Sequence, residues 1–343
     1  MKRTLIALGV IAATAAPLAA QANPTVYGRL NLSVQNTDVD TAASDVWDVR
    51  SNASRFGVRG DSKLTETLSA VYGIEWEVQG SGNNDSNGTE LSARNRSVGI
   101  KSSEWGTLRL GKLDTNVKLA EGRVDQFNDL AGDIDSVLGA QAGRARADNV
   151  IDYVSPKLAD LVTLNLQLIQ NEGAVDGSPV AADRGDGLAD GISASAVFTA
   201  GELTAILAVN KDVVSRLGGG ASDNLATDAV RLSASYNIKP AGLTLGAIYQ
   251  TAESDISAQD VEQDGFVLST ALKFADKWTA KAQYGQSTTD VNGTETDRST
   301  ASLGLDYALG KGARTYAFYT LNTTEAATDV DTTVYGIGLD YSF

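Results

Sequence analysis

The chain ends in the stretch TVYGIGLDYSF, residues 333–343, in which two kinds of side chain alternate. After Thr333, the odd-numbered positions carry Tyr335, Ile337, Leu339, Tyr341 and Phe343. The even-numbered positions carry Val334, Gly336, Gly338, Asp340 and Ser342. Because successive side chains of a β-strand point to opposite faces, this pattern predicts a strand with one apolar and one small or polar face. Aromatic residues near both ends of the apolar face are typical of a strand that crosses a membrane with that face toward lipid.

The same alternation recurs earlier in the chain. Segments 26–34, 68–78, 162–168, 230–238 and 266–274 carry apolar residues at most second positions, with polar or small residues between them. A half-buried strand of a soluble β-sandwich has the same period, so alternation alone leaves two classes of all-β protein open. After residue 22, no apolar run approaches the ~18 residues that a membrane-spanning helix needs.

The connections between the strands separate these two classes. We expect sixteen strands, which begin near residues 25, 53, 67, 94, 106, 148, 160, 191, 202, 228, 242, 264, 277, 298, 313 and 332. Their connections alternate between short and long, and the predicted long ones are Asn36–Asn52, Gln79–Ser92, Asp114–Ala147, Asn171–Asp190, Asp212–Thr227, Glu253–Gln263, Ser287–Asp297 and Asn322–Asp331. Short turns at one end and long loops at the other are typical of outer-membrane barrels. The sequence therefore predicts an all-β fold, a sixteen-stranded antiparallel transmembrane β-barrel whose lumen is wide enough for water.

The first residues have the parts of a secretory signal peptide. Lys2 and Arg3 form a short positive segment, residues 4–18 form a run of apolar and small residues, and Ala20-Gln21-Ala22 fits an A-x-A cleavage site. We expect cleavage after Ala22, so that residues 1–22 are the signal peptide and residues 23–343 form the barrel.

The composition excludes several classes of function. The chain contains no cysteine and no histidine, which removes disulfides, thiolate chemistry, histidine-dependent triads and histidine-ligated metals. We therefore expect no enzymatic activity, no metal and no cofactor. The net charge is −15, and loss of Lys2 and Arg3 with the signal peptide makes the mature chain more negative still. We expect no nucleic-acid partner, because phosphate binding requires a basic surface.

Five motifs resemble those of the Gram-negative outer-membrane porin family. They are VYGRL (26–30), SRFGVRG (54–60), RSVGIK (96–101), WGTLRLGK (105–112) and DNVIDYVSP (148–156). The terminal Phe343 resembles the family's signal for membrane assembly. The sequence departs from the family at Asp152, where a basic or aromatic residue facing the pore is expected.

The resemblance implies a homotrimer of barrels in the outer membrane of a Gram-negative bacterium. It also implies that the long third loop, here about Asp114 to Ala147, folds into the lumen and narrows it. This loop is much longer than the ~4–6 residues of a median connection, and its carboxylates are Glu121, Asp125, Asp129, Asp133 and Asp135. The resemblance implies that it faces a basic wall formed by Arg29, Arg55, Arg59, Arg94, Arg96, Arg109 and Arg146.

Two interpretations of the arginines stay open at this point. They can create an electric field across the lumen, or they can pair with neighbouring carboxylates and support the wall, and both can hold together. Arg94 and Arg96 share strand parity with the apolar Val98 and Ile100, so the direction of their side chains stays open as well.

These observations predict a water-filled channel for passive diffusion of ions and small hydrophilic solutes, with weak charge selectivity and with outer-membrane lipid and lipopolysaccharide as its surroundings. One alternative is a porin selective for one nutrient class, which would need an aromatic track or a dense cluster of one charge. Aromatic residues make up only 6% of the chain, which favours the general channel. A further alternative is a structural or adhesive barrel, for which the triplet Arg184-Gly185-Asp186 is a weak indication.

Overall fold

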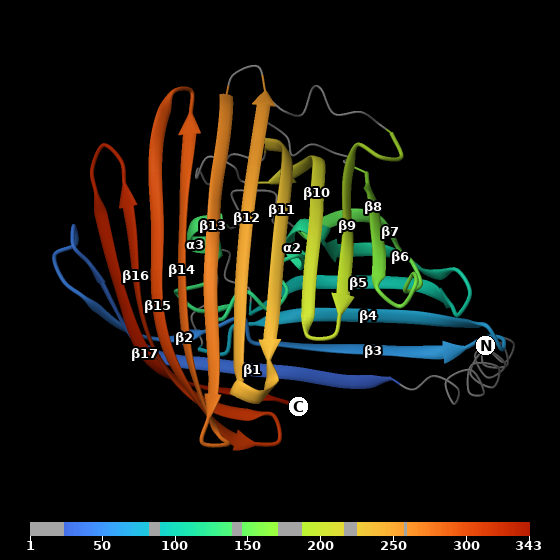
Figure 1. Cartoon of the computed structure of the whole chain (residues 1–343), viewed down its shortest axis with the longest axis horizontal. Coiled ribbons are helices and arrows are strands. Elements are labelled where there is room, and N and C mark those ends of the chain that lie inside the picture. The colour runs from blue at the N-terminus through green and yellow to red at the C-terminus, as the bar shows by residue number, and fades with distance from the viewer. Residues whose placement is uncertain (1–23, 82–89, 139–145, 171–186, 216–224, 257–258) are drawn as a thin grey trace, which may run out of the picture.

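The strands of the computed structural model form one closed antiparallel β-barrel (Figure 1). The structure describes residues 24–81, 90–138, 146–170, 187–215, 225–256 and 259–343. The predicted signal peptide and the triplet Arg184-Gly185-Asp186 lie outside these residues. The first strand, β1 (Thr25–Val39), pairs with the last, β17 (Val330–Ser342), and this pairing closes the sheet. The predicted barrel fold is therefore confirmed.

The remaining strands follow one another around the barrel in sequence order. In the first half they are β2 (Val46–Ser51), β3 (Arg55–Lys63), β4 (Leu68–Val78), β5 (Leu91–Ser102), β6 (Gly106–Asp114), β7 (Arg146–Val154) and β8 (Val162–Ile169). In the second half they are β9 (Gly191–Ala200), β10 (Leu203–Ser215), β11 (Leu225–Ile238), β12 (Leu243–Ile256), β13 (Gln259–Phe274), β14 (Trp278–Val291), β15 (Thr294–Gly310) and β16 (Ala313–Glu325).

The sheet has seventeen strand segments but sixteen barrel strands, because β2 and β3 are two parts of one strand. Both pair with β1, β2 opposite residues 32–37 and β3 opposite residues 25–29. Between them Ala53 has a φ of 49°, a left-handed value that interrupts the extended backbone. The strand expected from about residue 53 therefore starts at Val46, and the predicted connection Asn36–Asn52 shrinks to residues 40–45.

Other connections that were expected to be long are mostly strand. β14 and β15 stay paired as far as Val291 and Thr294, so that only Asn292 and Gly293 form the turn. Their φ angles of 54° and 82° suit a two-residue hairpin turn, for which Asn-Gly is the favoured sequence. Glu253–Gln263 and Asn322–Asp331 are likewise largely strand. These strand ends are rich in polar residues, so apolar alternation, which reports burial in lipid, does not reveal them.

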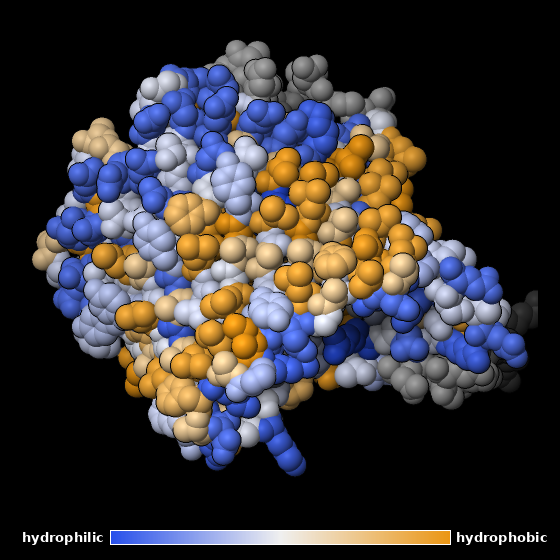
Figure 2. Space-filling view, in the orientation of Figure 1, coloured by the Kyte–Doolittle hydropathy of each residue, from blue (hydrophilic) through white to orange (hydrophobic). Residues whose placement is uncertain are grey.

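The two faces of the barrel wall differ in chemistry as the alternation predicts. In β17, Tyr335, Ile337, Leu339 and Tyr341 are exposed on the outer face, while Asp340 is buried on the inner face. Figure 2 shows apolar side chains gathered over the middle of the strands and hydrophilic ones at the upper end. The buried inner face is mostly polar, with Arg231, Gln250, Gln263, Gln283 and Ser302 among its side chains. This arrangement suits a barrel with lipid outside and water inside.

Two short helices, α2 (Asn116–Leu119) and α3 (Asp135–Leu138), lie in the connection between β6 and β7. A single 3₁₀ turn, Lys239–Ala241, links β11 and β12. Within the described residues, no helix is both long and apolar enough to cross a membrane.

Candidate functional site

Residues 115–138, here called the inner loop, pack against the inner face of the barrel. Three apolar clusters join the loop to inward-facing wall side chains. They are Val124, Ile134, Val137 and Leu138 with Ile248 and Val267; Phe127 and Leu130 with Tyr316, Phe318 and Val334; and Val117 and Ala120 with Ile206 and Ala208. Burial of these side chains on a wall that is otherwise polar stabilises the loop against strands β10 to β17.

Two carboxylates of the inner loop fix its backbone. Asp133 Oδ2 accepts a hydrogen bond from Asp129 N at 2.8 Å, and its Oδ1 accepts one from Asp135 N at 2.9 Å. Asp125 Oδ1 accepts from Phe127 N at 3.0 Å and from Gln283 Nε2 of β14 at 3.3 Å. Asp125 and Asp133 therefore hold the loop in shape, in addition to carrying charge.

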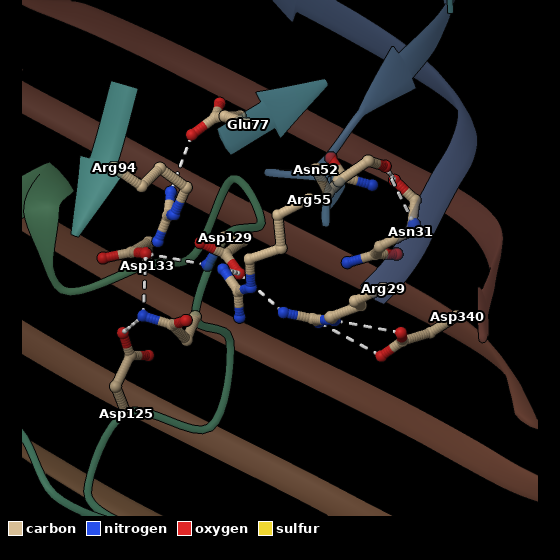
Figure 3. A network of polar contacts seen from close by, with 12 residues as sticks. Arg29, Asn31, Asn52, Arg55, Glu77, Arg94, Asp125, Asp129, Asp133 and Asp340 are labelled. Carbon is tan, nitrogen blue, oxygen red and sulfur yellow. Dashed lines mark hydrogen bonds and ion pairs between the residues drawn. The ribbon is translucent and has the colours of Figure 1, made fainter. Parts of the chain in front are cut away.

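A cavity of about 560 Å³ lies between the inner loop and strands β3 to β7. On the loop side it is lined by Lys118, Glu121, Asp125, Asp129, Asp133 and Asp135. On the wall side it is lined by Arg55, Glu77, Arg94, Asp114 and Arg146. The five carboxylates predicted for the loop and three of the predicted arginines thus border one space, part of which Figure 3 shows. Among the described residues, the lining holds seven carboxylates and four basic side chains, an excess of three negative charges.

Two of the three wall arginines of this cavity, Arg94 and Arg146, are also paired with wall carboxylates. Arg94 Nε lies 2.6 Å from Glu75 Oε1, and its Nη1 lies 2.7 Å from Glu77 Oε2. Arg146 Nε lies 3.0 Å from Asp114 Oδ1. The same guanidinium groups therefore border the cavity and brace the wall.

Arg29 belongs to a series of ion pairs that crosses the seam between β17 and β1. The series consists of Lys281–Asp306 (3.1 Å), Asp306–Arg314 (2.6 Å), Arg314–Asp340 (2.8 Å), Asp340–Arg29 (2.9 Å) and Arg29–Asp129 (2.7 Å). Arg55 Nη1 also lies 3.5 Å from Asp129 Oδ2. The series links β14 to the tip of the inner loop, and Figure 3 shows its last members.

Sequence reasoning missed four members of this series, namely Lys281, Asp306, Arg314 and Asp340. These four residues alternate with apolar residues on predicted strands, and this alternation could have placed their side chains in the lumen. Their pairing was not accessible, because Arg29 and Asp340 are 311 positions apart in sequence and meet only when the barrel closes.

Three more of the predicted wall arginines do not border this cavity, namely Arg59, Arg96 and Arg109. A register shift between Ile74 and Trp76 changes the parity within β5, so Arg94 points inward while Arg96 lies on the outer face, its guanidinium 5.9 Å from the centre of the Trp76 ring. The expectation that Arg96 faces the pore is therefore wrong. Arg109 Nη2 lies 2.8 Å from Asp152 Oδ2. Asp152, the residue at which the sequence departs from the family, therefore forms an ion pair within the wall.

Arg59 lines a second cavity, near the turn between β3 and β4, together with Lys63 and Lys101. Its guanidinium lies 4.7 Å from the centre of the Tyr27 ring. Neither Arg59 nor Arg109 borders the cavity beside the inner loop.

Phe343 completes the closing seam. Its backbone N donates to Gly28 O, and its O accepts from Gly28 N, both at 3.0 Å. A Cβ added to Gly28 would lie 2.4 Å from Phe343 Cζ, so the ring covers the glycine directly. The last residue of the chain is thus seated on the first strand.

Comparison with known proteins also indicates an outer-membrane porin. A model of the family described as Gram-negative porin matches residues 7–343. Outer membrane porin protein 32 of Delftia acidovorans is 26% identical over 92% of this chain and 88% of its own length. An outer membrane porin protein of Bordetella pertussis is 28% identical over 46% of this chain, and the match spans only 45% of that relative's length.

Solved structures share the fold. An anion-selective porin from Comamonas acidovorans superposes with a TM-score of 0.74 at 20% identity, over 94% of this chain and 100% of that one. The trimer form of OmpT, an outer membrane protein of Vibrio cholerae, gives a TM-score of 0.71 at 20% identity, over 94% and 99%. With the family match over nearly the whole sequence and a closed antiparallel β-barrel, the chain belongs to the Gram-negative porin family and is a channel protein of the outer membrane.

Proposed function

We propose that this porin is a general diffusion channel for ions and small hydrophilic solutes, with a weak preference for cations. The observation that carries the proposal is the lining of the cavity beside the inner loop, where the described carboxylates exceed the described basic side chains by three. Low-dielectric walls focus such a field and raise the local concentration of the opposite ion. The paired arginines reduce the field without cancelling it, so the preference is weak.

The proposed narrowest part of the pore is this cavity, with Glu121, Asp125, Asp129, Asp133 and Asp135 opposite Arg55, Arg94 and Arg146. Arg29 contributes by holding Asp129 at the loop tip. The Comamonas acidovorans protein of the same fold is an anion-selective porin. A charge preference depends on individual side chains, and at 20% identity the fold can be shared while the lining differs.

Selectivity for one nutrient class is the second candidate. A site of that kind needs aromatic side chains for stacking or a cluster of one charge, and no aromatic residue is among the described residues that line this cavity. Basic and acidic groups are mixed along it instead, which supports general diffusion. The absence of histidine and cysteine from the whole sequence argues against an enzyme that relies on either residue.

We also propose that the protein is a homotrimer surrounded by outer-membrane lipid and lipopolysaccharide. Support comes from the outer belt of exposed apolar side chains and from the trimer form of the Vibrio cholerae protein of the same fold. Native mass measurement in detergent should show three chains. A purified monomer that keeps its full conductance would contradict this part of the proposal.

Insertion of the purified protein into a planar lipid bilayer tests the channel function. We expect stepwise increases of current, each of the same size, and permeation of small neutral sugars into loaded vesicles. A folded barrel that gives neither current steps nor sugar uptake would favour a structural or adhesive role.

A further inference from the structure

One basic side chain of the wall makes an unusual set of contacts with the inner loop. Arg231 of β11 is 0% exposed, although it carries a permanent charge. Its Nη1 donates to Val117 O of α2 at 3.0 Å, and its Nη2 donates to Leu138 O of α3 at 3.3 Å. One guanidinium group therefore donates hydrogen bonds to both helices of the loop, at two carbonyl oxygens that are twenty-one positions apart in sequence.

The surroundings of Arg231 keep its orientation fixed. Nε donates to Gln250 Oε1 of β12 at 2.7 Å, and Gln250 Nε2 lies 3.5 Å from the same Leu138 O. Glu121 Oε1, which also lines the proposed narrow part of the pore, lies 3.9 Å from Nη1. The planar guanidinium has five donors in a rigid fork, so it can serve several acceptors in different directions at once.

The wall beside Arg231 is shaped to receive the loop. Strands β12, β13, β14 and β15 carry inward-facing glycines at Gly246, Gly265, Gly285 and Gly304. A Cβ at these positions would lie 3.0 Å from Val124 Cα, 2.5 Å from Leu138 Cδ2, 2.8 Å from Val137 Cγ2 and 2.9 Å from Phe127 Cε1, respectively. Four neighbouring strands thus omit a side chain where the loop lies, which fits a loop that stays in one place.

We propose that Arg231 is the positioning residue of the inner loop: by binding Val117 O and Leu138 O it fixes both ends of the loop's described part, and so sets the width and charge lining of the pore without touching the permeating ions. The effect on permeation rests on the proposed channel function, whereas the attachment of the loop does not.

Thiol labelling tests the attachment, because the natural chain contains no cysteine. A single Val137→Cys substitution places a thiol between the loop and the wall, at a position where the natural side chain is 2% exposed. A water-soluble methanethiosulfonate reagent should modify it slowly. Replacing Arg231 with Gln removes the guanidinium donor to Val117 O and one of the two side-chain donors to Leu138 O, so the labelling rate should rise about tenfold or more. Ser103→Cys, in an exposed turn, is the control for reagent access and should not change.

Matched variants distinguish positioning from general loosening. Arg314→Gln also removes a positive charge from the inner wall, but the ion pairs of Arg314 are with Asp306 and Asp340 of the wall and, among the described residues, it donates to no loop carbonyl, so labelling at Val137→Cys should stay slow. Arg231→Lys keeps the charge but loses the fork, and should label at an intermediate rate. If Arg231→Gln does not fold, Arg231→Lys alone decides the question, and a wild-type labelling rate in it would overturn the proposal.

Electrical recording of the same variants connects the loop to permeation. Arg231→Gln should give a larger and noisier single-channel current, partly restored in Arg231→Lys, whereas heat stability of the folded barrel should fall little. Equal labelling in Arg231→Gln and the parent, or an equal rise in Arg314→Gln, would overturn the positioning role. A parent protein without any current would instead overturn the channel function and leave the labelling result valid.

Discussion

Arg29 Nη1 on β1 lies 2.7 Å from Asp129 Oδ2 at the tip of the inner loop, so the two residues are in contact and do not face each other across open water. The sequence predicted both residues at the narrow part of the pore, on opposite sides. The contact instead attaches the loop tip to the closing seam. Arg55, the cross-strand neighbour of Arg29, lies 3.5 Å from the same Asp129 oxygen and borders the cavity together with Arg94 and Arg146.

Replacing Arg29 with Gln should destabilise the protein. Arg29 also binds Asp340, and the three side chains are only 9–16% exposed, so the variant leaves two carboxylates short of a partner. We expect a loss of about 1–3 kcal/mol in the free energy of unfolding, measured by urea titration in detergent. Arg50→Gln, which removes a positive charge from an exposed position of β2, is the control. Equal losses in both variants would show that the contact with Asp129 and Asp340 contributes nothing specific.

Gly28 and Phe343 should be coupled energetically. Gly28→Ala places a methyl group against the Phe343 ring and should lower the yield of refolded barrel, read from gel mobility without heating. Phe343→Ala should also lower the yield, because it weakens the seam. Adding Gly28→Ala to Phe343→Ala should cost little more, since the ring is gone. If the alanine costs the same in both backgrounds, the ring does not rest on Gly28.

Asp133 and Asp135 should differ in what they do for the loop. Each substitution to Ala removes one negative charge from the cavity, so both should move the reversal potential in a salt gradient toward anions. Asp133→Ala also removes the acceptor of Asp129 N and Asp135 N, and should therefore add current noise in single-channel records. Indistinguishable noise in the two variants would mean that Asp133 contributes charge only.

Arg94 should oppose the cation preference. Its guanidinium borders the cavity and partly neutralises Glu75 and Glu77. Arg94→Gln should therefore increase cation preference, whereas Arg94→Lys should stay close to the parent. The shift should shrink in concentrated salt, because the screening length falls from about 10 Å at 0.1 M to about 3 Å at 1 M. A shift that persists unchanged at 1 M would point to a change of pore shape instead of charge.

Much of the barrel could be predicted from sequence, because lipid on one side and water on the other impose period two on each strand. The alternation in residues 333–343 predicted the facing of Tyr335 and Asp340 correctly. Alternation did not reveal the strand ends that extend beyond the lipid, such as the polar ends around Asn292 and Gly293. The Asn-Gly dipeptide is itself a signal for a hairpin turn.

The site was predictable in outline only. Loop carboxylates and most inward arginines could be read from position and parity. Parity failed at Arg94, which a register shift in β5 turns inward, whereas Arg96 keeps the outward parity of Val98 and only the family resemblance placed it in the pore. Arg231 has the inward parity of its strand, yet its contacts with Val117 and Leu138 depend on how the loop folds back, which no local pattern encodes.

The zero-current potential of the purified protein, measured in a bilayer between dilute and concentrated KCl, tests the central claim most directly. Through a cation-preferring pore, K⁺ diffuses into the dilute compartment faster than Cl⁻ does. The excess of three negative charges among the described residues of the cavity lining predicts a dilute compartment that is positive relative to the concentrated one. A dilute compartment that is negative, as for an anion-preferring pore, or a potential of zero would contradict the assignment of this cavity as the selective part of the pore.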